Sequence, residues 1–317
     1  MTIVFMGTPA AAAVSLKMLI DEGHEIAAVY TQPDRPSGRG NRVSFSPVKE
    51  VALAAGLTVH QPLRVKTEDA AELFRSHAAE IAVVVAYGRI LPEAFLNAYP
   101  LGAVNVHFSL LPKYRGAAPV NWAIANGETE TGVTTMRMDQ GLDTGAILLQ
   151  SPTAIGAEEN SIELMDRLAG LGAELLSQTL SGFNTIVPRK QDDAAATFAP
   201  MLSKADGMID WLSPAQQIVN RVRGFQPFPS SFTFIGDKRL TVWAARPGHR
   251  DEAAVPGTVI ECAGDRFSVA CGERSMIEII ELQIEGKRRM NTRDFINGVK
   301  PEKGIILGDR ALVKDGR

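Results

Sequence analysis

Asn105, His107 and Asp143 have the residue types and spacing of a site for acid–base chemistry. Asn105 and His107 alternate with valines in a segment typical of a β-strand, so both side chains lie on one face. Asp143 follows in a segment rich in glycine and aspartate, which predicts a loop. A single buried histidine is more often a core residue than a catalyst. An amide and a carboxylate beside an imidazole that titrates near neutral pH nevertheless favour a catalytic site that moves protons.

The first half of the chain has a pattern that can bring these residues together. Short β-branched runs alternate with helical patterns, which predicts βαβ units on a mostly parallel sheet. Ligands bind beyond the carboxyl ends of such strands, where Asn105 and His107 lie. We expect strands at residues 2–6, 27–31, 57–60, 81–86, 103–107, 133–138 and 146–150, and helices at 10–21, 48–55, 68–77, 92–96 and 161–180.

The second half changes to short strands separated by glycine and proline, which predicts a small β-barrel. The fold class is therefore α/β, a Rossmann-like sheet domain followed by an OB-like barrel. We expect a catalytic domain over residues 1–188, a polar linker over 189–204 and the barrel over 205–317. The expected barrel strands are residues 231–234, 240–244, 257–260, 267–270 and 277–284.

Composition excludes several classes of protein. The 317 residues include 33 basic and 36 acidic side chains, a net charge of −3, which excludes a histone-like coat for nucleic acid. Two cysteines cannot form a secreted disulfide framework, and no Cys/His cluster has the spacing of a metal site. The apolar runs are too short to span a membrane. We expect a cytoplasmic, soluble monomer without metal; the turn at Gly7-Thr8-Pro9 lacks the three-glycine dinucleotide motif.

Several motifs along the chain point together to one enzyme family. The first motif is Asn105-x-His107-x-Ser109-Leu110-Leu111-Pro112, and the second is the loop Asp139-x-Gly141-Leu142-Asp143-Thr144-Gly145. Others are Val84-Val85-Ala86-Tyr87-Gly88, Gly116-Ala117-Ala118-Pro119, Ile209-Asp210-Trp211 and Pro227-x-Pro229. This set, which covers nearly the whole chain, resembles the formyltransferases that use 10-formyltetrahydrofolate.

The resemblance implies transfer of a formyl group from the folate N10 to the amino group of methionyl initiator tRNA, for translation initiation. Attack by the amine on the formyl carbon creates an oxyanion, for which the Asn105 amide and the His107 imidazolium would be hydrogen-bond donors. Asp143 would orient the imidazole and favour its charged form. The amine proton would pass to Asp143 directly or through water, and the sequence leaves both routes open.

The resemblance also implies the binding residues. Ser109, Leu110, Leu111 and Pro112 would line the folate site, together with Tyr87 and Gly88 at the end of the central strand. A basic loop over residues 33–47 would grip the tRNA acceptor stem, since arginine suits phosphate and guanine contacts. The tRNA-binding residues expected by resemblance are Arg39, Arg42 and Lys204.

Two other functions remain open. One is a formyltransferase acting on a small amine, such as an amino sugar nucleotide or glycinamide ribonucleotide. The other is a noncatalytic module that binds tRNA or senses folate. The basic loop and the β-rich second domain argue against the first, and the intact set of Asn105, His107 and Asp143 argues against the second.

Overall fold

The computed structural model describes residues 1–37, 42–250 and 253–308, and the chain divides into two compact units. Both units are built from separate stretches of the sequence, so the division does not follow a single boundary. Unit 1 comprises Met1–Pro119, Glu130–Ala154 and Leu164–Pro200, and unit 2 comprises Val120–Thr129, Ile155–Glu163 and the chain from Met201 onward.

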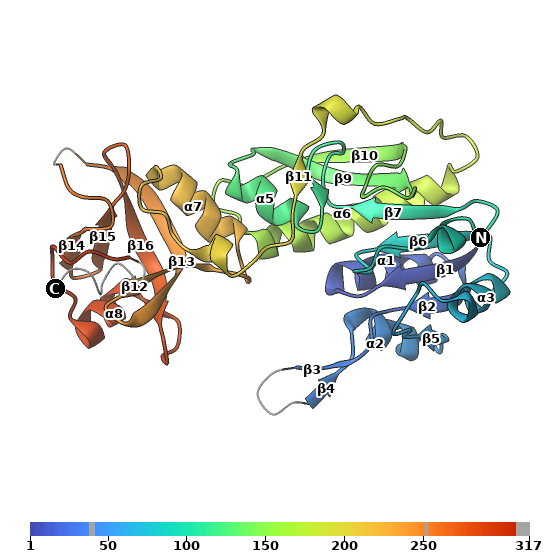
Figure 1. Ribbon diagram of the computed structural model, residues 1–317, viewed down its shortest axis with the longest axis horizontal. Coiled ribbons are helices and arrows are strands. Elements are labelled where there is room, and N and C mark those ends of the chain that lie inside the picture. Colours follow the sequence, from blue (N-terminus) through green and yellow to red (C-terminus); the bar gives the residue numbers. More distant parts are fainter. Residues whose placement is uncertain (38–41, 251–252, 309–317) are drawn as a thin grey trace. The chain divides into compact units, whose positions relative to one another are not determined.

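Unit 1 is built on a seven-stranded sheet with the order β10-β9-β7-β6-β1-β2-β5 (Figure 1). Neighbours from β7 to β5 pair in parallel, whereas β9 pairs antiparallel with both β7 and β10. This confirms the mostly parallel sheet. Its strands are β1 (Thr2–Gly7), β2 (Glu25–Tyr30), β5 (Val59–His60), β6 (Ile81–Val85), β7 (Ala103–His107), β9 (Glu130–Arg137) and β10 (Ile147–Ala154).

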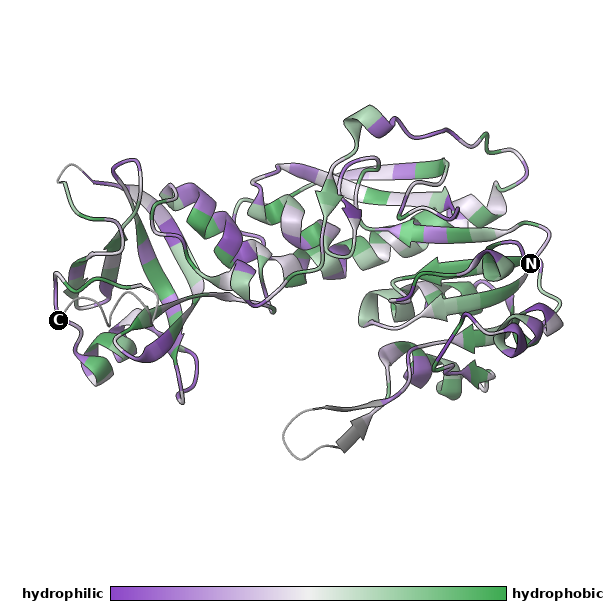
Figure 2. Ribbon diagram, viewed as in Figure 1, coloured by the Kyte–Doolittle hydropathy of each residue, from purple (hydrophilic) through white to green (hydrophobic). Residues whose placement is uncertain are grey.

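Helices cover both faces of this sheet. Gly7 of β1 packs on Ala12 of α1 (Ala10–Asp21), and α6 (Ser161–Ser181) packs with Gly172 against Val106 and Val133 on the same face. The opposite face is covered by α3 (Glu68–Ser76) and α4 (Glu93–Leu96), whose phenylalanines join one apolar cluster with the strands. Figure 2 shows the central strands as the most hydrophobic part of unit 1, as expected for strands buried on both faces.

Side-chain caps begin several helices where the sequence turns from extended to helical. Ser46 accepts a hydrogen bond from Lys49 N at 3.1 Å, ahead of α2 (Pro47–Ala54), and Thr67 accepts one from Ala70 N at 3.3 Å, ahead of α3. Such caps satisfy backbone donors that have no partner in the first helical turn.

Two short pairings fall outside the predicted elements. β3 (Arg35–Ser37) and β4 (Arg42–Ser44) form an antiparallel hairpin in the basic loop. β8 (Arg115–Gly116) pairs in parallel with β11 (Phe198–Ala199), which lies in the segment that the sequence predicts as a linker. Residues 189–200 therefore belong to unit 1 rather than connecting two domains freely.

Unit 2 contains an antiparallel sheet with the order β12-β13-β16-β15-β14, with β17 on β16. The edge strands β12 and β14 are bridged by the chain after α8: Gly308 N donates to Phe234 O at 3.2 Å, and Val259 N donates to Ile305 O at 2.8 Å. These bonds close the sheet in the manner predicted for a barrel. The strands are β12 (Ser231–Ile235), β13 (Lys238–His249), β14 (Val259–Ala263), β15 (Arg266–Ala270), β16 (Ser275–Ile284) and β17 (Met290–Asn291).

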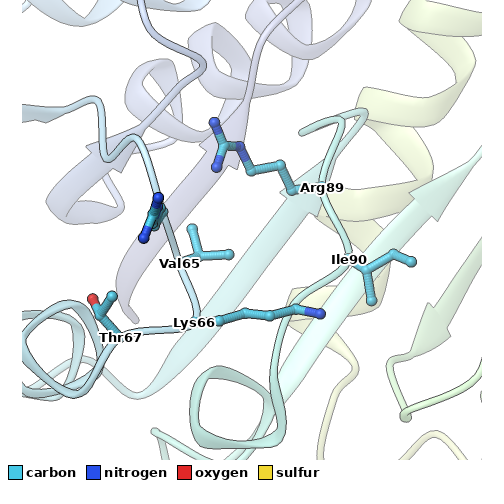
Figure 3. Close-up of a pocket in the computed structure, with 6 residues that line it drawn as sticks. Val65, Lys66, Thr67, Arg89 and Ile90 are labelled. Atoms are coloured by element: carbon cyan, nitrogen blue, oxygen red, sulfur yellow. The ribbon is translucent and has the colours of Figure 1, made fainter.

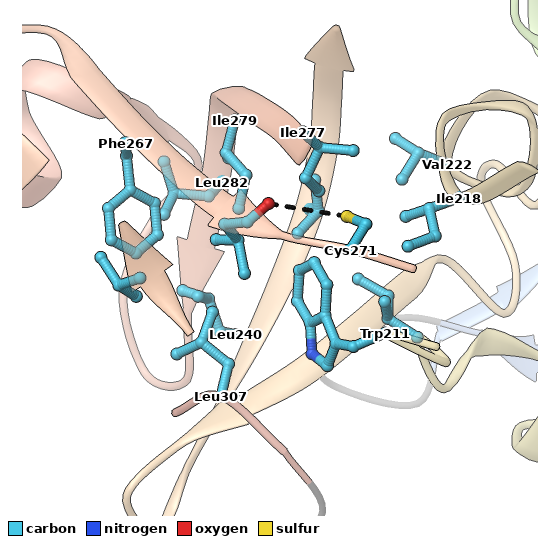
Figure 4. Close-up of a cluster of buried hydrophobic side chains, with 14 of the residues drawn as sticks. Trp211, Ile218, Val222, Leu240, Phe267, Cys271, Ile277, Ile279, Leu282 and Leu307 are labelled. Carbon is cyan, nitrogen blue, oxygen red and sulfur yellow. Dashed lines mark hydrogen bonds between the residues drawn. The ribbon is translucent and has the colours of Figure 1, made fainter. Parts of the chain in front are cut away.

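Two helices that the sequence analysis missed complete the core of unit 2. α7 (Ala215–Gly224) contributes Ile218 and Val222, and α8 (Thr292–Val299) places Phe295 against Phe267, with ring centroids 5.3 Å apart. Figure 4 shows Trp211 and Cys271 within the same cluster. Burial raises the pKa of the Cys271 thiol to about 12, so this cysteine is a packed core residue.

The earlier segments of unit 2 are held to α7 and to the chain that follows it. Asn121, in α5 (Pro119–Ala125), donates to Gly224 O at 2.8 Å, and the Trp122 ring lies 5.3 Å from that of Phe225. Arg223 donates to Gly156 O and Glu159 O at 3.2 and 2.9 Å. Residues 120–129 and 155–163 are therefore integral to unit 2. Among the described residues no helix is both long and apolar enough to cross a membrane.

Two half-buried histidines near the sheet edge predict a loss of stability in mild acid. The Tyr30 ring lies 4.9 Å from that of His60, and the rings of His60 and His77 are 5.0 Å apart. Burial lowers the pKa of both histidines from the usual 6.5. The unfolded chain therefore binds more protons below pH 6.5, and stability falls as the pH drops through that value, by at most about 1.4 kcal/mol per pH unit for each site.

Urea unfolding at pH 7.5 and 5.5 measures this loss. The variant His60→Phe keeps the ring that stacks on Tyr30 and removes one titrating group, so its stability should depend less steeply on pH. Equal pH dependence in the variant and the parent chain would contradict the prediction.

Candidate active site

Strand β7 places Asn105 and His107 on one face of the sheet at its carboxyl end. In register, Asn105 lies beside Val84 of β6 and Met136 of β9, and Val84 belongs to the face covered by α3 and α4. The exposed fractions of Asn105 and His107 are 9% and 6%. Among the described residues the Asn105 amide makes no hydrogen bond, so its donors are available at a nearly buried position.

The His107 imidazole lies between two oxygen acceptors. Its Nε2 donates to the Tyr114 carbonyl at 2.9 Å, and its Nδ1 lies 3.6 Å from Asp143 Oδ2. An imidazolium, which has a donor on each ring nitrogen, satisfies both neighbours. The structure thus brings together His107 and Asp143, which the sequence analysis had paired from separate motifs.

Asp143 is held by contacts to its side chain and to its loop. Its Oδ2 accepts a hydrogen bond from Gly116 N at 2.9 Å, and its φ of 55° lies in the left-handed region. Earlier in the loop, Asp139 Oδ1 accepts from Gly141 N and from the Thr144 hydroxyl, at 3.0 and 2.6 Å. The carboxylate is therefore fixed by the fold of its own loop and by β8.

Glycine is needed at two places that support this loop. A Cβ on Gly145 would stand 1.7 Å from the carbonyl oxygen of Arg137, the last residue of β9. A Cβ on Gly116, which has a φ of 125°, would stand 2.6 Å from the Ala199 carbonyl oxygen. Backbone approaches backbone at both positions, so no side chain could move aside to make room.

The segment expected to contact folate is itself strongly held. The Ser109 hydroxyl donates to Lys113 O at 2.6 Å, and Leu111 packs with Met136 and Ile147. Thr134 of β9 donates to Ser109 O at 2.6 Å and accepts from Leu111 N at 3.1 Å. Ser109 and Leu111 are buried, whereas Leu110 and Pro112 retain accessible surface.

Tyr87 and Gly88 follow β6 and directly precede Arg89, which lines a cavity of about 510 Å³ (Figure 3). The Tyr87 side chain is buried in the cluster under α3 and α4, and Gly88 is exposed. Arg89, which follows them, donates to Gln32 Oε1 at 3.0 Å and to Leu63 O at 2.6 Å. The cavity is lined by Arg64, Val65, Lys66, Thr67, Arg89 and Ile90.

This cavity is strongly basic. Arg64 and Lys66 are exposed, and within the described ranges neither forms an ion pair. Neither residue was indicated by the sequence, because both stand in an irregular segment before α3 without a recognisable motif. Arg89 could have been found, since it directly follows the Tyr87-Gly88 motif at a strand end.

The residues expected to bind tRNA are distributed over both units. Arg39 lies outside the described residues, and Arg42 is the first residue of β4 in the basic hairpin. Lys204 is exposed and precedes the short 3₁₀ helix η2 (Ala205–Gly207) in unit 2.

Comparison with known proteins identifies the family. Residues 1–180 match the Formyl transferase family, and residues 201–300 match its C-terminal domain. The chain belongs to the formyl transferase family. It is 51% identical over 314 residues to the methionyl-tRNA formyltransferase of Solibacter usitatus, covering 98% of this chain and all of that one. The methionyl-tRNA formyltransferase of Citrifermentans bemidjiense is 49% identical, over 98% of this chain and 97% of the relative.

Solved structures of lower identity share the fold of this formyltransferase. An N-formyltransferase from Helicobacter canadensis, in complex with folinic acid and dTDP-3-aminofucose, has a TM-score of 0.64 at 18% identity, covering 87% of this chain and 98% of its own. Glycinamide ribonucleotide transformylase 1 from Symbiobacterium toebii has a TM-score of 0.50 at 20% identity, covering 60% and 94%. The predicted fold class and the assignment to formyl transfer are confirmed.

Proposed function

We propose that this formyltransferase moves the formyl group of 10-formyltetrahydrofolate to the amino group of methionyl initiator tRNA. The arrangement of Asn105, His107 and Asp143 at the end of β7 is the observation that carries the proposal. The identity of about half to methionyl-tRNA formyltransferases, over nearly the full length of the chain, supports methionyl-tRNA as the acceptor. The product would be the formylated aminoacyl-tRNA that starts translation.

In the proposed reaction the neutral amine attacks the formyl carbon, forms the new C–N bond and leaves an oxyanion on the formyl oxygen. The unpartnered Asn105 amide donates a hydrogen bond to this oxyanion, and the positive charge of the His107 imidazolium, whose two N–H groups face Tyr114 O and Asp143, stabilises it electrostatically. Breakage of the bond between the formyl carbon and the folate N10 then completes the transfer. The amine gives up one proton, to Asp143 or to a water beside it, and N10 gains one from the His107–Asp143 pair, so the pair ends the cycle with the protons it began with.

For the folate we propose the crevice at the carboxyl ends of β6 and β7. Leu110, Pro112 and Gly88 offer accessible surface there, while Ser109, Leu111 and Tyr87 support the walls from within. A folate carries a flat pterin at one end and glutamate carboxylates at the other. The basic cavity lined by Arg64, Lys66 and Arg89 suits the carboxylate end.

For the tRNA we propose contacts from the basic hairpin and from unit 2. Arg39 and Arg42 belong to the basic loop of residues 33–47, Arg42 begins β4, and Lys204 would contribute from unit 2. Arginine and lysine neutralise phosphates, so this binding should weaken as salt rises. Each unit would thus have a share in recognising the acceptor.

One assay tests the proposed function directly. The full chain is incubated with 10-formyltetrahydrofolate and, in separate reactions, methionyl initiator tRNA, an amino sugar nucleotide or glycinamide ribonucleotide. We expect formylated product only with the tRNA. Product from a small amine alone would replace the proposed acceptor, and folate binding without transfer would favour a noncatalytic module.

The basic cavity predicts an effect on folate affinity. Replacing both Arg64 and Lys66 with alanine should raise the KM for the folate about tenfold and change kcat little, since each exposed charge contributes up to about 1 kcal/mol. Arg75→Ala is the matched control, because Arg75 lies in α3 and pairs with exposed Glu68 at 2.8 Å. An unchanged folate KM in the double variant would exclude the cavity from the folate site.

A further inference from the structure

Gln191, in the segment expected to be a linker, is a buried amide that contacts the loop of Asp143. Its exposed fraction is 5%. Its Nε2 donates to the carbonyl oxygens of Asp143 and Gly145, both at 2.8 Å. The backbone on both sides of Thr144 is therefore anchored by one side chain from outside the loop.

The guanidinium of Arg115 fixes the orientation of this amide. Arg115 Nε and one terminal nitrogen donate to Gln191 Oε1 at 3.0 and 2.8 Å. A glutamine amide has one acceptor end and one donor end, so occupation of the oxygen by Arg115 directs the NH₂ group to the two loop carbonyls. Arg115 is 4% exposed, and its guanidinium also pairs with Asp193 at 2.8 Å.

These contacts form a closed ring around the candidate catalytic carboxylate. Gly116, which follows Arg115 in β8, donates its N–H to Asp143 Oδ2. Gln191 then holds the Asp143 backbone and is itself held by Arg115. Asp143 is thus fixed at its side chain and at its carbonyl by neighbours that constrain each other.

The ring bears on the distance between the carboxylate and the imidazole. Asp143 has a positive φ, an uncommon conformation outside glycine whose energetic cost the surrounding contacts must offset. Release of the Asp143 and Gly145 carbonyls would let this backbone relax, and the Asp143 carboxylate would leave its place 3.6 Å from His107 Nδ1. A displacement of about 1 Å in an active site can cost about a hundredfold in rate.

We propose that Gln191 is a positioning residue for formyl transfer: oriented by Arg115, it holds the Asp143 loop so that the carboxylate faces His107. Gln191 touches neither substrate in this assignment and acts only through Asp143. The inference rests on the proposed function, because its measure is the rate of that reaction. The segment between the two family domains, residues 181–200, would then contribute to catalysis by positioning Asp143.

The test compares Gln191→Leu, Gln191→Glu and the parent chain in steady-state formylation of methionyl initiator tRNA. Gln191→Leu removes all four hydrogen bonds, whereas Gln191→Glu keeps an acceptor for Arg115 and loses the donors to the loop carbonyls. Both should lower kcat roughly ten- to a hundredfold. The dissociation constant of 5-formyltetrahydrofolate should stay within about twofold of that of the parent chain. The pH profile of kcat should change, since Asp143 no longer faces the imidazole.

Asp193→Asn is the matched control, because it removes only the negative charge of the exposed partner of Arg115; the Asp193 side chain is 71% accessible. Its kcat and pH profile should match those of the parent chain. If Gln191→Leu does not fold, Gln191→Glu decides alone. A kcat within threefold of the parent, or a loss of kcat with an unchanged pH profile, would overturn the positioning role. No product from the parent chain would instead contradict the proposed function.

Discussion

Replacing His107 with alanine is expected to lower kcat by about 10²–10⁴-fold, the usual contribution of a positioned acid–base group. The imidazole contacts both Asp143 and the Tyr114 carbonyl in the loop after β7. Removing it takes away the positive charge that stabilises the oxyanion and leaves a cavity beside the Asp143 carboxylate. Rates should be measured with both substrates saturating, so that loss of binding cannot imitate loss of chemistry.

The dissociation constants of tRNA and of a folate analogue should remain within about twofold in His107→Ala. His24→Ala is a suitable control, since that histidine lies near Glu22 at the end of α1, away from the predicted catalytic motif. Turnover by His107→Ala close to that of the parent chain would exclude the proposed role of the imidazole.

Substituting alanine for Gly145 is expected to have the second large effect. The new Cβ would stand 1.7 Å from Arg137 O, and neither backbone can yield without moving β9 or the Asp143 loop. The loop is the less regular of the two, so Asp143 should be displaced from His107. We expect kcat to fall by about 10²-fold or more and the free energy of unfolding to fall by about 1–3 kcal/mol.

Gly170→Ala provides the matched control for this substitution. Gly170 lies within α6, and a Cβ there would meet no atom within 4 Å. Alanine in a helix interior should raise the stability by up to about 1 kcal/mol and leave kcat unchanged. Urea unfolding and initial rates on the three proteins separate the two effects. A fully active Gly145→Ala would show that the loop tolerates the displacement.

The fold of unit 1 could be predicted because its signal is local. Helix α1 begins and ends where its periodicity predicted, and the alternation in β7 correctly placed Asn105 and His107 on one face. α7 and α8 were missed because they are short and rich in residues such as Asn, Gly and Val that are weak helix formers. Contacts with the barrel core stabilise them, and the local pattern does not record those contacts.

Asn105 and His107 could be predicted because their residue types coincide with the end of a predicted strand. Gln191 was missed because it contacts the Asp143 loop from a segment far away in the sequence. Gln191 lies 48 positions from Asp143 and 76 from Arg115, and its polar, alanine-rich surroundings have no periodicity. The β8–β11 pair that brings these segments together is only two residues long on each side. Such links depend on the finished tertiary structure, which no window of sequence contains.

The composition of unit 2 from three stretches limits how the protein can be taken apart. A fragment cut at residue 204 would keep α5 and residues 155–163 but lose α7. Asn121 of α5 donates to Gly224 of α7, and Arg223 of α7 donates to Glu159, so the cut breaks both contacts. The cut would expose more of Trp122, which packs on Phe225, and would leave the Asn121 amide without its acceptor at Gly224. A chimaera that exchanges the barrel for that of a relative should therefore also exchange residues 120–129 and 155–163. A recombinant that separates either stretch from its own barrel would lose the contacts that hold the stretch to α7.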